Sequence, residues 1–316
     1  MTNSQHHSQS IRAFLRKHQL DSSYLDNATH WFNPVADHLA SIVSQRDGET
    51  LIVGVTGSQG SGKSTLAAYL NAILTDQHGL RCVNCSLDDF YLRRSERADL
   101  AAHSHPLLIT RGVPGTHDTE LVIKVLTALS QPRGTVAIPQ FDKATDDRSD
   151  TAQQVTLPID VVIFEGWCLG AAAHAENSLY QPINQLERER DENGAWRRFV
   201  NAQLRDHYQP LFNLIEQLIM LRAPSFDCVF KWRLEQEQKL AQSLAQSTDE
   251  NTIATRLMSA AEIDTFIQHY QRITERLIES PPPTVKHLFD LDEQRQIMRY
   301  SKAHPEPSPT PITIDT

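Results

Sequence analysis

Cysteine is scarce in this chain, which contains only four among 316 residues. So few cysteines cannot build a disulfide framework in a chain of this length, and their scarcity indicates a reducing compartment. Cys82 and Cys85 form a C-x-x-C pair, but no second pair completes a zinc site. The pair also precedes a strand-like run, whereas a redox pair opens a helix. We therefore expect ordinary buried thiols.

Long apolar runs and an excess of basic residues are also missing. No run approaches the roughly 18 apolar residues that cross a bilayer, and residues 1–10 are polar, unlike a signal peptide. The chain has 30 Lys and Arg against 39 Asp and Glu, a formal net charge of −9. Nucleic-acid-binding surfaces normally carry a basic excess. We therefore expect a cytoplasmic protein with neither a membrane nor a nucleic acid as partner.

The hydrophobic pattern divides the chain into one large unit with extensions. Its 40% of hydrophobic residues are enough for a sizeable core. Apolar positions spaced three to four apart predict a helical N-terminal extension over residues 1–46. The main domain is expected over residues 47–300, followed by a proline-rich, loosely held tail at 301–316. Residues 171–201 are polar and charged, which predicts an insertion outside the core.

Short buried strands alternate with helices in the main domain. Apolar runs, several rich in β-branched residues, predict strands at residues 51–55, 82–87, 160–164 and 218–222, and residues 63–74 read as a helix. Strands that alternate with helices are typical of a parallel sheet. The predicted fold is therefore α/β, with a mostly parallel sheet and helices on both of its faces.

Residues 57–64, GSQGSGKS, match the phosphate-loop pattern G-x-x-x-x-G-K-[ST] at every fixed position. The loop follows a predicted strand and opens a predicted helix, so its glycines and backbone N–H groups can surround phosphates. Lys63 can reach the β- and γ-phosphates, and the Ser64 hydroxyl can join a Mg²⁺ shell. The pattern predicts a P-loop NTPase that uses ATP and Mg²⁺, since no N/T-K-x-D guanine motif follows. The expected ATP-binding residues are Gly57, Ser58, Gln59, Gly60, Ser61, Gly62, Lys63, Ser64 and Thr65.

Acidic residues follow two of the predicted strands. Asp88 and Asp89 end the second strand, and Glu165 ends the third. Ligands of open α/β sheets bind beyond the carboxyl ends of the strands, so these acids should face the phosphate loop. A hydroxyl nucleophile needs a carboxylate to accept its proton, and we assign that role to Asp88. Glu165 is expected to bind Mg²⁺ together with Ser64.

Further segments extend the pattern beyond the phosphate loop. They are DDFY at 88–91, RGVPGTHD at 111–118, IPQFDK at 138–143 with Arg148 and Asp150, FEGWCLG at 164–170, WRR at 196–198 and KWRLEQE at 231–237. With these, the chain resembles the phosphoribulokinase, uridine kinase and pantothenate kinase family over roughly residues 35–295, in the branch of plant-type D-glycerate 3-kinases. The resemblance implies that Asp88 is the catalytic base. One departure is Gln140, where the branch prefers arginine.

Glycerate carries one carboxylate and two hydroxyls, so its site needs cations and hydrogen-bonding partners. The candidate substrate residues are the cations Arg111, Lys143 and Arg148, with His117, Asp118 and Asp142 for the hydroxyls. By resemblance, residues 225–248 form a helical lid that closes over the phosphates, and its Arg233 touches the transferring charge. The WRR segment is expected to be structural or to form an oligomer contact.

The hypothesis is an ATP-dependent kinase whose partner is a small-molecule hydroxyl acceptor, with D-glycerate the first choice. Asp88 and Lys63 are its catalytic residues. Two alternatives remain open: a kinase of another small alcohol, such as a nucleoside or a pantothenate-like compound, and a regulatory P-loop ATPase that acts on a protein. Release of ADP that depends on an acceptor separates the kinases from the ATPase.

Overall fold

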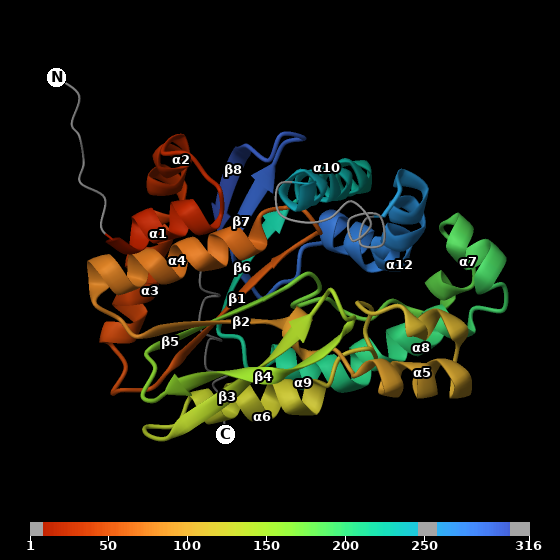
Figure 1. Cartoon of the computed structure of the whole chain (residues 1–316), viewed down its shortest axis with the longest axis horizontal. Helices are drawn as coiled ribbons and strands as arrows, with labels where there is room; N and C mark the ends of the chain where they lie inside the picture. Colours follow the sequence, from red (N-terminus) through yellow and green to blue (C-terminus); the bar gives the residue numbers. More distant parts are fainter. Residues whose placement is uncertain (1–8, 246–257, 304–316) are drawn as a thin grey trace, which may run out of the picture.

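Six strands form the central sheet, in the order β2-β5-β1-β6-β7-β8 (Figure 1). The structure is a computed structural model that describes residues 9–245 and 258–303. All neighbours are parallel except β7 and β8. The mostly parallel sheet and the four predicted strands are confirmed, while β7 and β8 were not predicted. The strands are β1 Leu51–Gly57, β2 Cys82–Ser86, β5 Val161–Gly166, β6 Gln217–Arg222, β7 Val285–Leu291 and β8 Ile297–Lys302.

Side chains alternate along β1 and supply both faces of the sheet with core residues. Leu51, Val53 and Val55 belong to the core on one face, and Ile52 belongs to the core on the other. This alternation follows from the two-residue period of a strand. Because β1 is central and covered on both sides, all seven of its residues are buried.

The N-terminal helices cover one face together with the helix that follows the phosphate loop. Figure 1 shows α1, α2 and α3 gathered beside α4. The Phe14 ring of α1 meets the Tyr69 ring of α4 edge-on at 5.6 Å. The predicted helical extension is therefore present, and it shares the core of this face. The helices are α1 Gln9–Lys17, α2 Ser23–Trp31, α3 Asn33–Ser44 and α4 Lys63–His78, with α10 Phe226–Ala245 next to them.

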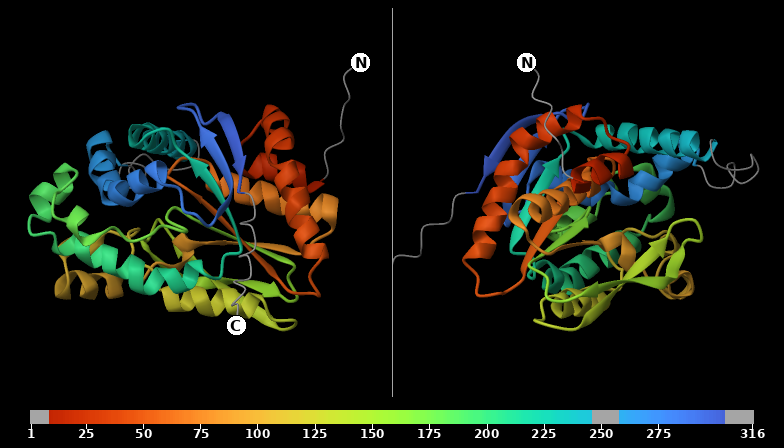
Figure 2. Two further views of the ribbon diagram at one scale, coloured as in Figure 1. Left: turned by 180° about the vertical axis from the view of Figure 1, so that it is seen from behind. Right: turned by 60° about the vertical axis from the view of Figure 1, so that its left-hand side comes forward.

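The other face is covered by helices from the second half of the chain and by α6. Figure 2 shows α6 and the antiparallel β3–β4 hairpin on the side of the molecule away from β8. The hairpin forms a sheet of its own and packs on the segment after β2. The remaining elements are β3 Thr135–Asp142, β4 Asp147–Thr156, α5 Arg94–His103, α6 Thr119–Leu129, α7 Gln185–Arg190, α8 Ala195–Gln203, α9 Gln209–Phe212 and α12 Ala260–Glu279, with the 3₁₀ helices η1 Leu87–Phe90, η2 Pro106–Ile109 and η3 Glu176–Leu179 and the π-helical segment η4 Leu204–Tyr208.

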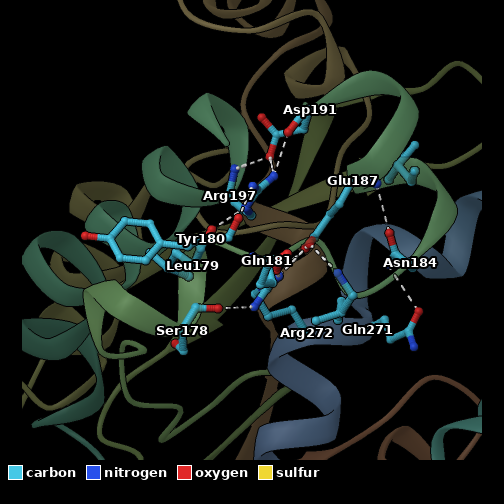
Figure 3. A network of polar contacts seen from close by, with 12 residues as sticks. Ser178, Leu179, Tyr180, Gln181, Asn184, Glu187, Asp191, Arg197, Gln271 and Arg272 are labelled. Carbon is cyan, nitrogen blue, oxygen red and sulfur yellow. Dashed lines mark hydrogen bonds and ion pairs between the residues drawn. The ribbon is translucent and has the colours of Figure 1, made fainter. Parts of the chain in front are cut away.

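The exclusion of residues 171–201 from the core was wrong. Leu186 and Trp196 are 3% exposed and belong to the core beside the sheet. Three of the charged residues that suggested an exposed insertion, Glu187, Asp191 and Arg197, are buried and paired inside the protein. Arg197 binds Asp191 at 2.9 Å, and Arg272 of α12 binds Glu187 at 2.5 Å (Figure 3). Because each buried charge meets an opposite charge and further hydrogen bonds, a polar segment can be buried here.

The ends of the predicted regions also differ from the structure. Ser301 and Lys302 lie in β8 instead of the tail, because they pair with β7. The rest of the predicted tail at 304–316, residues 1–8 of the N-terminal extension, and residues 246–248 of the predicted lid lie outside the described residues. Across the part of the chain that is described, no helix is long and apolar enough to span a membrane.

Candidate active site

Three neighbouring strands place the predicted residues at one edge of the sheet. The phosphate loop follows β1, Glu165 lies near the end of β5, and Asp88 follows β2 by two residues. In the register of the parallel strands, Val55 and Ser86 both pair with Glu165. Because β5 lies between β1 and β2, Glu165 stands between the loop and Asp88. This edge is where open α/β sheets bind their ligands.

The backbone of the phosphate loop requires its glycines. Gly60 and Gly62 have φ angles of 77° and 93°, which side-chain-bearing residues rarely adopt. A Cβ on Gly60 would also lie 2.5 Å from Cβ of Trp232, and one on Gly57 would lie 2.9 Å from the carbonyl oxygen of Leu221. Packing therefore requires glycine at positions 57 and 60, and the backbone conformation favours it at positions 60 and 62.

Polar groups of the loop point into buried space without internal partners. Oγ of Ser58, Oε1 of Gln59 and Oγ of Ser61 are buried and accept or donate no hydrogen bond among the described residues. A buried polar group without a partner costs free energy, so such groups cluster where a ligand supplies the partner. The helix α4 begins at Lys63 directly behind them and presents its N-terminal N–H groups to an anion. The loop thus fits a phosphate chain.

Glu165 accepts hydrogen bonds from one hydroxyl of the phosphate loop and one hydroxyl of β2. Its Oε1 accepts hydrogen bonds from Oγ of Ser64 and Oγ of Ser86, each at 2.9 Å. Its Oε2 lies 3.9 Å from Nζ of Lys63 and has no hydrogen-bond partner among the described residues. Carboxylate and hydroxyl oxygens are the ligands that Mg²⁺ prefers, and it usually takes one or two of them besides phosphate and water. Ser64 and Glu165 therefore fit the predicted metal site.

Asp88 is held by two donors on opposite oxygens. The Tyr91 hydroxyl donates to Oδ1 at 2.7 Å, and Nζ of Lys143 lies 3.1 Å from Oδ2. Burial raises the pKa of this carboxyl, but Lys143, Lys63 and the Tyr91 hydroxyl together hold it well below its usual range. Asp88 is thus a carboxylate at neutral pH, the state that a proton acceptor needs.

The neighbouring Asp89 has a different environment. Its Oδ1 accepts a hydrogen bond from the backbone N–H of Phe141 at 3.1 Å, so it fastens the β3–β4 hairpin to the segment after β2. Burial raises the pKa of Asp89 to about 6, with a further contribution from the charge of Asp88. Two adjacent carboxyls with such different surroundings have different tasks, and the contacts of Asp89 are structural.

His117 lies behind Tyr91 in the protein interior. It is 4% exposed, its ring stacks on the Tyr91 ring at 4.6 Å, and its Nδ1 meets the Tyr208 hydroxyl at 2.6 Å. Burial lowers the pKa of His117 to about 4, so the ring is neutral at neutral pH. Its position supports the phenol that holds Asp88. Tyr91 and Tyr208 had no predicted role, although Tyr91 belongs to the DDFY segment.

Arg148 contacts both Tyr91 and Asp118. Nη2 of Arg148 donates to the carbonyl oxygen of Tyr91 at 3.0 Å and lies 3.4 Å from Oδ2 of Asp118. Asp118 also begins α6, where its Oδ1 accepts the N–H of Leu121 at 3.0 Å. Asp142, at the end of β3, accepts the N–H of Ala144 at 2.8 Å. These three predicted substrate residues thus all have partners within the protein.

Arg111 is oriented in part by Asp146 and Arg97, two residues that the sequence did not point to. Its guanidinium pairs with Oδ1 of Asp146, whose Oδ2 meets Nη2 of Arg97 at 2.9 Å. The guanidinium lies over the ring of Phe141, 5.3 Å from its centre, and 5.9 Å from the ring centre of Tyr91. Arg97 is 1% exposed and is anchored to the carbonyl oxygens of neighbouring loops. Nothing in the pattern around Arg97 sets it apart from a surface arginine.

The helix predicted as a lid is present, and its first half packs against the phosphate loop. Trp232 of α10 is 2% exposed and contacts Gly60. Arg233 pairs with Glu237 at 2.5 Å and lies over the ring of Phe266 of α12 at 6.0 Å. The contact of Arg233 with a transferring phosphoryl group stays a prediction.

Comparisons with known proteins give relatives along most of the chain, although no family model matches it. The chain is 34% identical over 241 residues to the uncharacterized kinase mug58 of Schizosaccharomyces pombe, covering 71% of this chain and 79% of that protein. It is 27% identical over 247 residues to the chloroplastic D-glycerate 3-kinase of Arabidopsis thaliana, covering 75% of this chain and 49% of the plant protein. Among solved structures, a D-glycerate 3-kinase of Cryptococcus neoformans has a TM-score of 0.71 at 25% identity, covering 86% of this chain and 98% of its own.

Proposed function

This chain belongs to the P-loop kinase family of the uridine and pantothenate kinases, in the branch of the D-glycerate 3-kinases, and from that premise we propose that it phosphorylates a hydroxyl of a small acid, with D-glycerate as the first candidate. The phosphoryl donor is ATP. The observation that carries the proposal is the presence of two carboxylates beside the phosphate loop. Glu165 accepts a hydrogen bond from Ser64 at 2.9 Å and lies 3.9 Å from Nζ of Lys63, and Asp88, two residues after the neighbouring strand β2, is bound by Tyr91 and Lys143.

Each group of residues beyond the carboxyl ends of β1, β2 and β5 has a task in phosphoryl transfer. The loop and Lys63 bind the phosphates, and the buried hydroxyls of Ser58 and Ser61 gain partners when they do. Ser64 and Glu165 would hold Mg²⁺, which would neutralise part of the phosphate charge. Asp88 accepts the proton of the acceptor hydroxyl. A carboxylate base of this kind suits a hydroxyl acceptor, and it favours a kinase over a regulatory ATPase.

The acceptor site is proposed beside Asp88, where Lys143 pairs with the base and Arg111 lies over the ring of Tyr91, whose hydroxyl holds that base. Lys143 is 65% exposed and pairs with Oδ2 of Asp88. An anionic acceptor can therefore bind the charge of Lys143, while the hydroxyl of the acceptor replaces Lys143 at Oδ2 of Asp88. Arg111 carries one carboxylate partner, Asp146, on Nη1, and its Nε and Nη2 make no hydrogen bond to the described part of the chain. Those two donors can bind a carboxylate of the acceptor in the planar geometry that guanidinium favours.

A screen of acceptors tests the proposal. ADP release is measured with ATP and Mg²⁺ in the presence of D-glycerate, related hydroxy acids, nucleosides or pantothenate, and Lys63→Ala serves as the inactive control. D-glycerate should stimulate ADP release, and phosphorus NMR then shows whether the 2- or the 3-phosphate forms. Turnover of a nucleoside without turnover of D-glycerate would keep the kinase and exclude glycerate. ADP release that no acceptor stimulates would favour the regulatory ATPase.

A further inference from the structure

The phosphate loop is in contact with a turn 235 residues further along the chain. Nε of Arg295, in the turn between β7 and β8, donates a hydrogen bond to the carbonyl oxygen of Gly60 at 2.7 Å. Gly60 is the middle glycine of the loop. No motif of this turn indicated a role in the sequence, and no step of the proposed reaction uses it.

The turn is built to present this side chain. Asp292 Oδ1 accepts the backbone N–H groups of Gln294 and Gln296, both at 2.8 Å, and the N–H of Arg295 donates to the carbonyl oxygen of Asp292 at 3.1 Å. Aspartate favours turns through such bonds to its own backbone. Arg295 itself has a φ angle of 65°, a conformation that residues other than glycine rarely adopt. The turn therefore fixes the direction in which its side chain leaves the backbone.

Two residues of α10 also hold the guanidinium of Arg295 in place. Nη2 of Arg295 pairs with Oε2 of Glu235 at 2.6 Å, and the guanidinium lies over the Trp232 ring, 5.2 Å from its centre. Trp232 donates its indole N–H to the carbonyl oxygen of Glu293 at 2.7 Å, so α10 and the turn are joined directly. Arg295 is thus oriented before it meets the loop.

The hydrogen bond to Gly60 fixes one peptide plane of the loop. In a trans peptide the carbonyl and the following N–H point in opposite directions. Because Arg295 holds the carbonyl of Gly60, the N–H of Ser61 must point to the other side, where it meets the carbonyl oxygen of Ser58 at 3.2 Å within the loop. Trp232 packs on Gly60 and leaves no room for a Cβ there, which limits its movement further.

We propose that Arg295 is a positioning residue for nucleotide binding, which sets the Gly60–Ser61 peptide of the phosphate loop before ATP arrives. The inference rests on the proposed nucleotide site. A loop that is already in its binding conformation pays less conformational entropy on binding. Loss of Arg295 should therefore weaken ATP binding and leave acceptor binding unchanged.

The test compares Arg295→Ala with Arg299→Ala. Arg299 is an arginine of the same hairpin that pairs with Asp290 and is 65% exposed, so it is a matched control for the loss of a charge. Binding of a non-hydrolysable ATP analogue with Mg²⁺ is measured by calorimetry. Arg295→Ala should raise Kd about tenfold or more, as loss of a charge-assisted hydrogen bond does. Arg295→Lys can donate to Gly60 or pair with Glu235 but cannot reproduce the planar contact. Its Kd for the analogue should therefore lie between those of Arg299→Ala and Arg295→Ala.

Two further readouts separate positioning from a merely structural role. Amide hydrogen exchange of residues 58–62 in the nucleotide-free protein should be faster in Arg295→Ala and unchanged in Arg299→Ala, with similar Tm values for the two variants. The KM for ATP should rise while the KM for the acceptor stays constant. An Arg295→Ala protein that binds the analogue as wild type does, with unchanged exchange, overturns the inference alone. A wild-type protein that does not bind the analogue refutes the proposed nucleotide site itself, and the inference with it.

Discussion

Replacement of Asp88 by asparagine tests the assignment of the catalytic base. Asparagine keeps the shape of the side chain and an oxygen that can still accept the hydrogen bond of the Tyr91 hydroxyl, now 2.7 Å from Oδ1. It loses the ability to accept a proton. General acid–base catalysis contributes about 10²-fold or more, so we expect kcat to fall at least about 10²-fold, or about 2.7 kcal/mol in the barrier.

The effect on stability should be small by comparison. Among the described residues, the ion pair that the substitution breaks is the one with Lys143, whose side chain is 65% exposed, and an exposed pair contributes about 0–1 kcal/mol. The matched control is Asp89→Asn. Its amide oxygen can replace Oδ1 as the acceptor of the Phe141 N–H, so kcat should fall less than in Asp88→Asn.

Steady-state ADP release at several pH values measures both variants. Because the pKa of Asp88 is held well below its usual range, the base stays ionised as the pH falls, and kcat/KM should not decline near pH 6 through loss of this group. The pKa of Asp89 is about 6. An acid limb near pH 6 that disappears in Asp89→Asn, with a larger loss of kcat in that variant, would show that Asp89 is the base.

Four further outcomes are expected. Lys63→Ala should abolish turnover and weaken ATP binding with the fold intact by circular dichroism, and a near-normal kcat would exclude the nucleotide site. Lys143→Ala should raise the KM for the acceptor and leave the KM for ATP nearly constant, whereas the reverse would place Lys143 at ATP. Because burial raises the folded-state pKa of Asp89 to about 6, its contribution to stability is present below pH 4 and is lost as the pH rises through about 6. The difference in unfolding free energy between wild type and Asp89→Asn should therefore change between about pH 4 and pH 6 and stay constant at higher pH. Arg197→Ala should lower the free energy of unfolding by about 3–5 kcal/mol in urea, because Asp191 would remain buried without its partner, and a loss below 1 kcal/mol would contradict the account of this pair.

Local patterns were sufficient for the centre of the sheet and for the phosphate loop. Residues 51–55 are apolar because β1 is covered on both faces, and such a run leaves few alternatives to a buried strand. The loop is equally local, since its glycines, its lysine and the start of α4 are consecutive. By contrast, the pattern could not give β4, because eight of its ten residues are polar and six are exposed, and the strand is held by pairing with β3. In β7 a buried polar residue, His287, interrupts the apolar alternation.

The sequence by itself determined the phosphate loop, four strands of the sheet, three of which carry the candidate site, and the acids Asp88 and Glu165 at the strand ends, because each depends on neighbouring residues only. The tertiary structure decided which side chains meet there. Ser86 reaches Glu165 because β2 pairs with β5, and Arg295 reaches Gly60 because β7 and β8 extend the sheet to the side of the loop that faces α10. It also decided that Glu187 is buried, since its partner, Arg272 of α12, lies 85 residues further along the chain. Contacts between distant segments depend on packing, which no local pattern records.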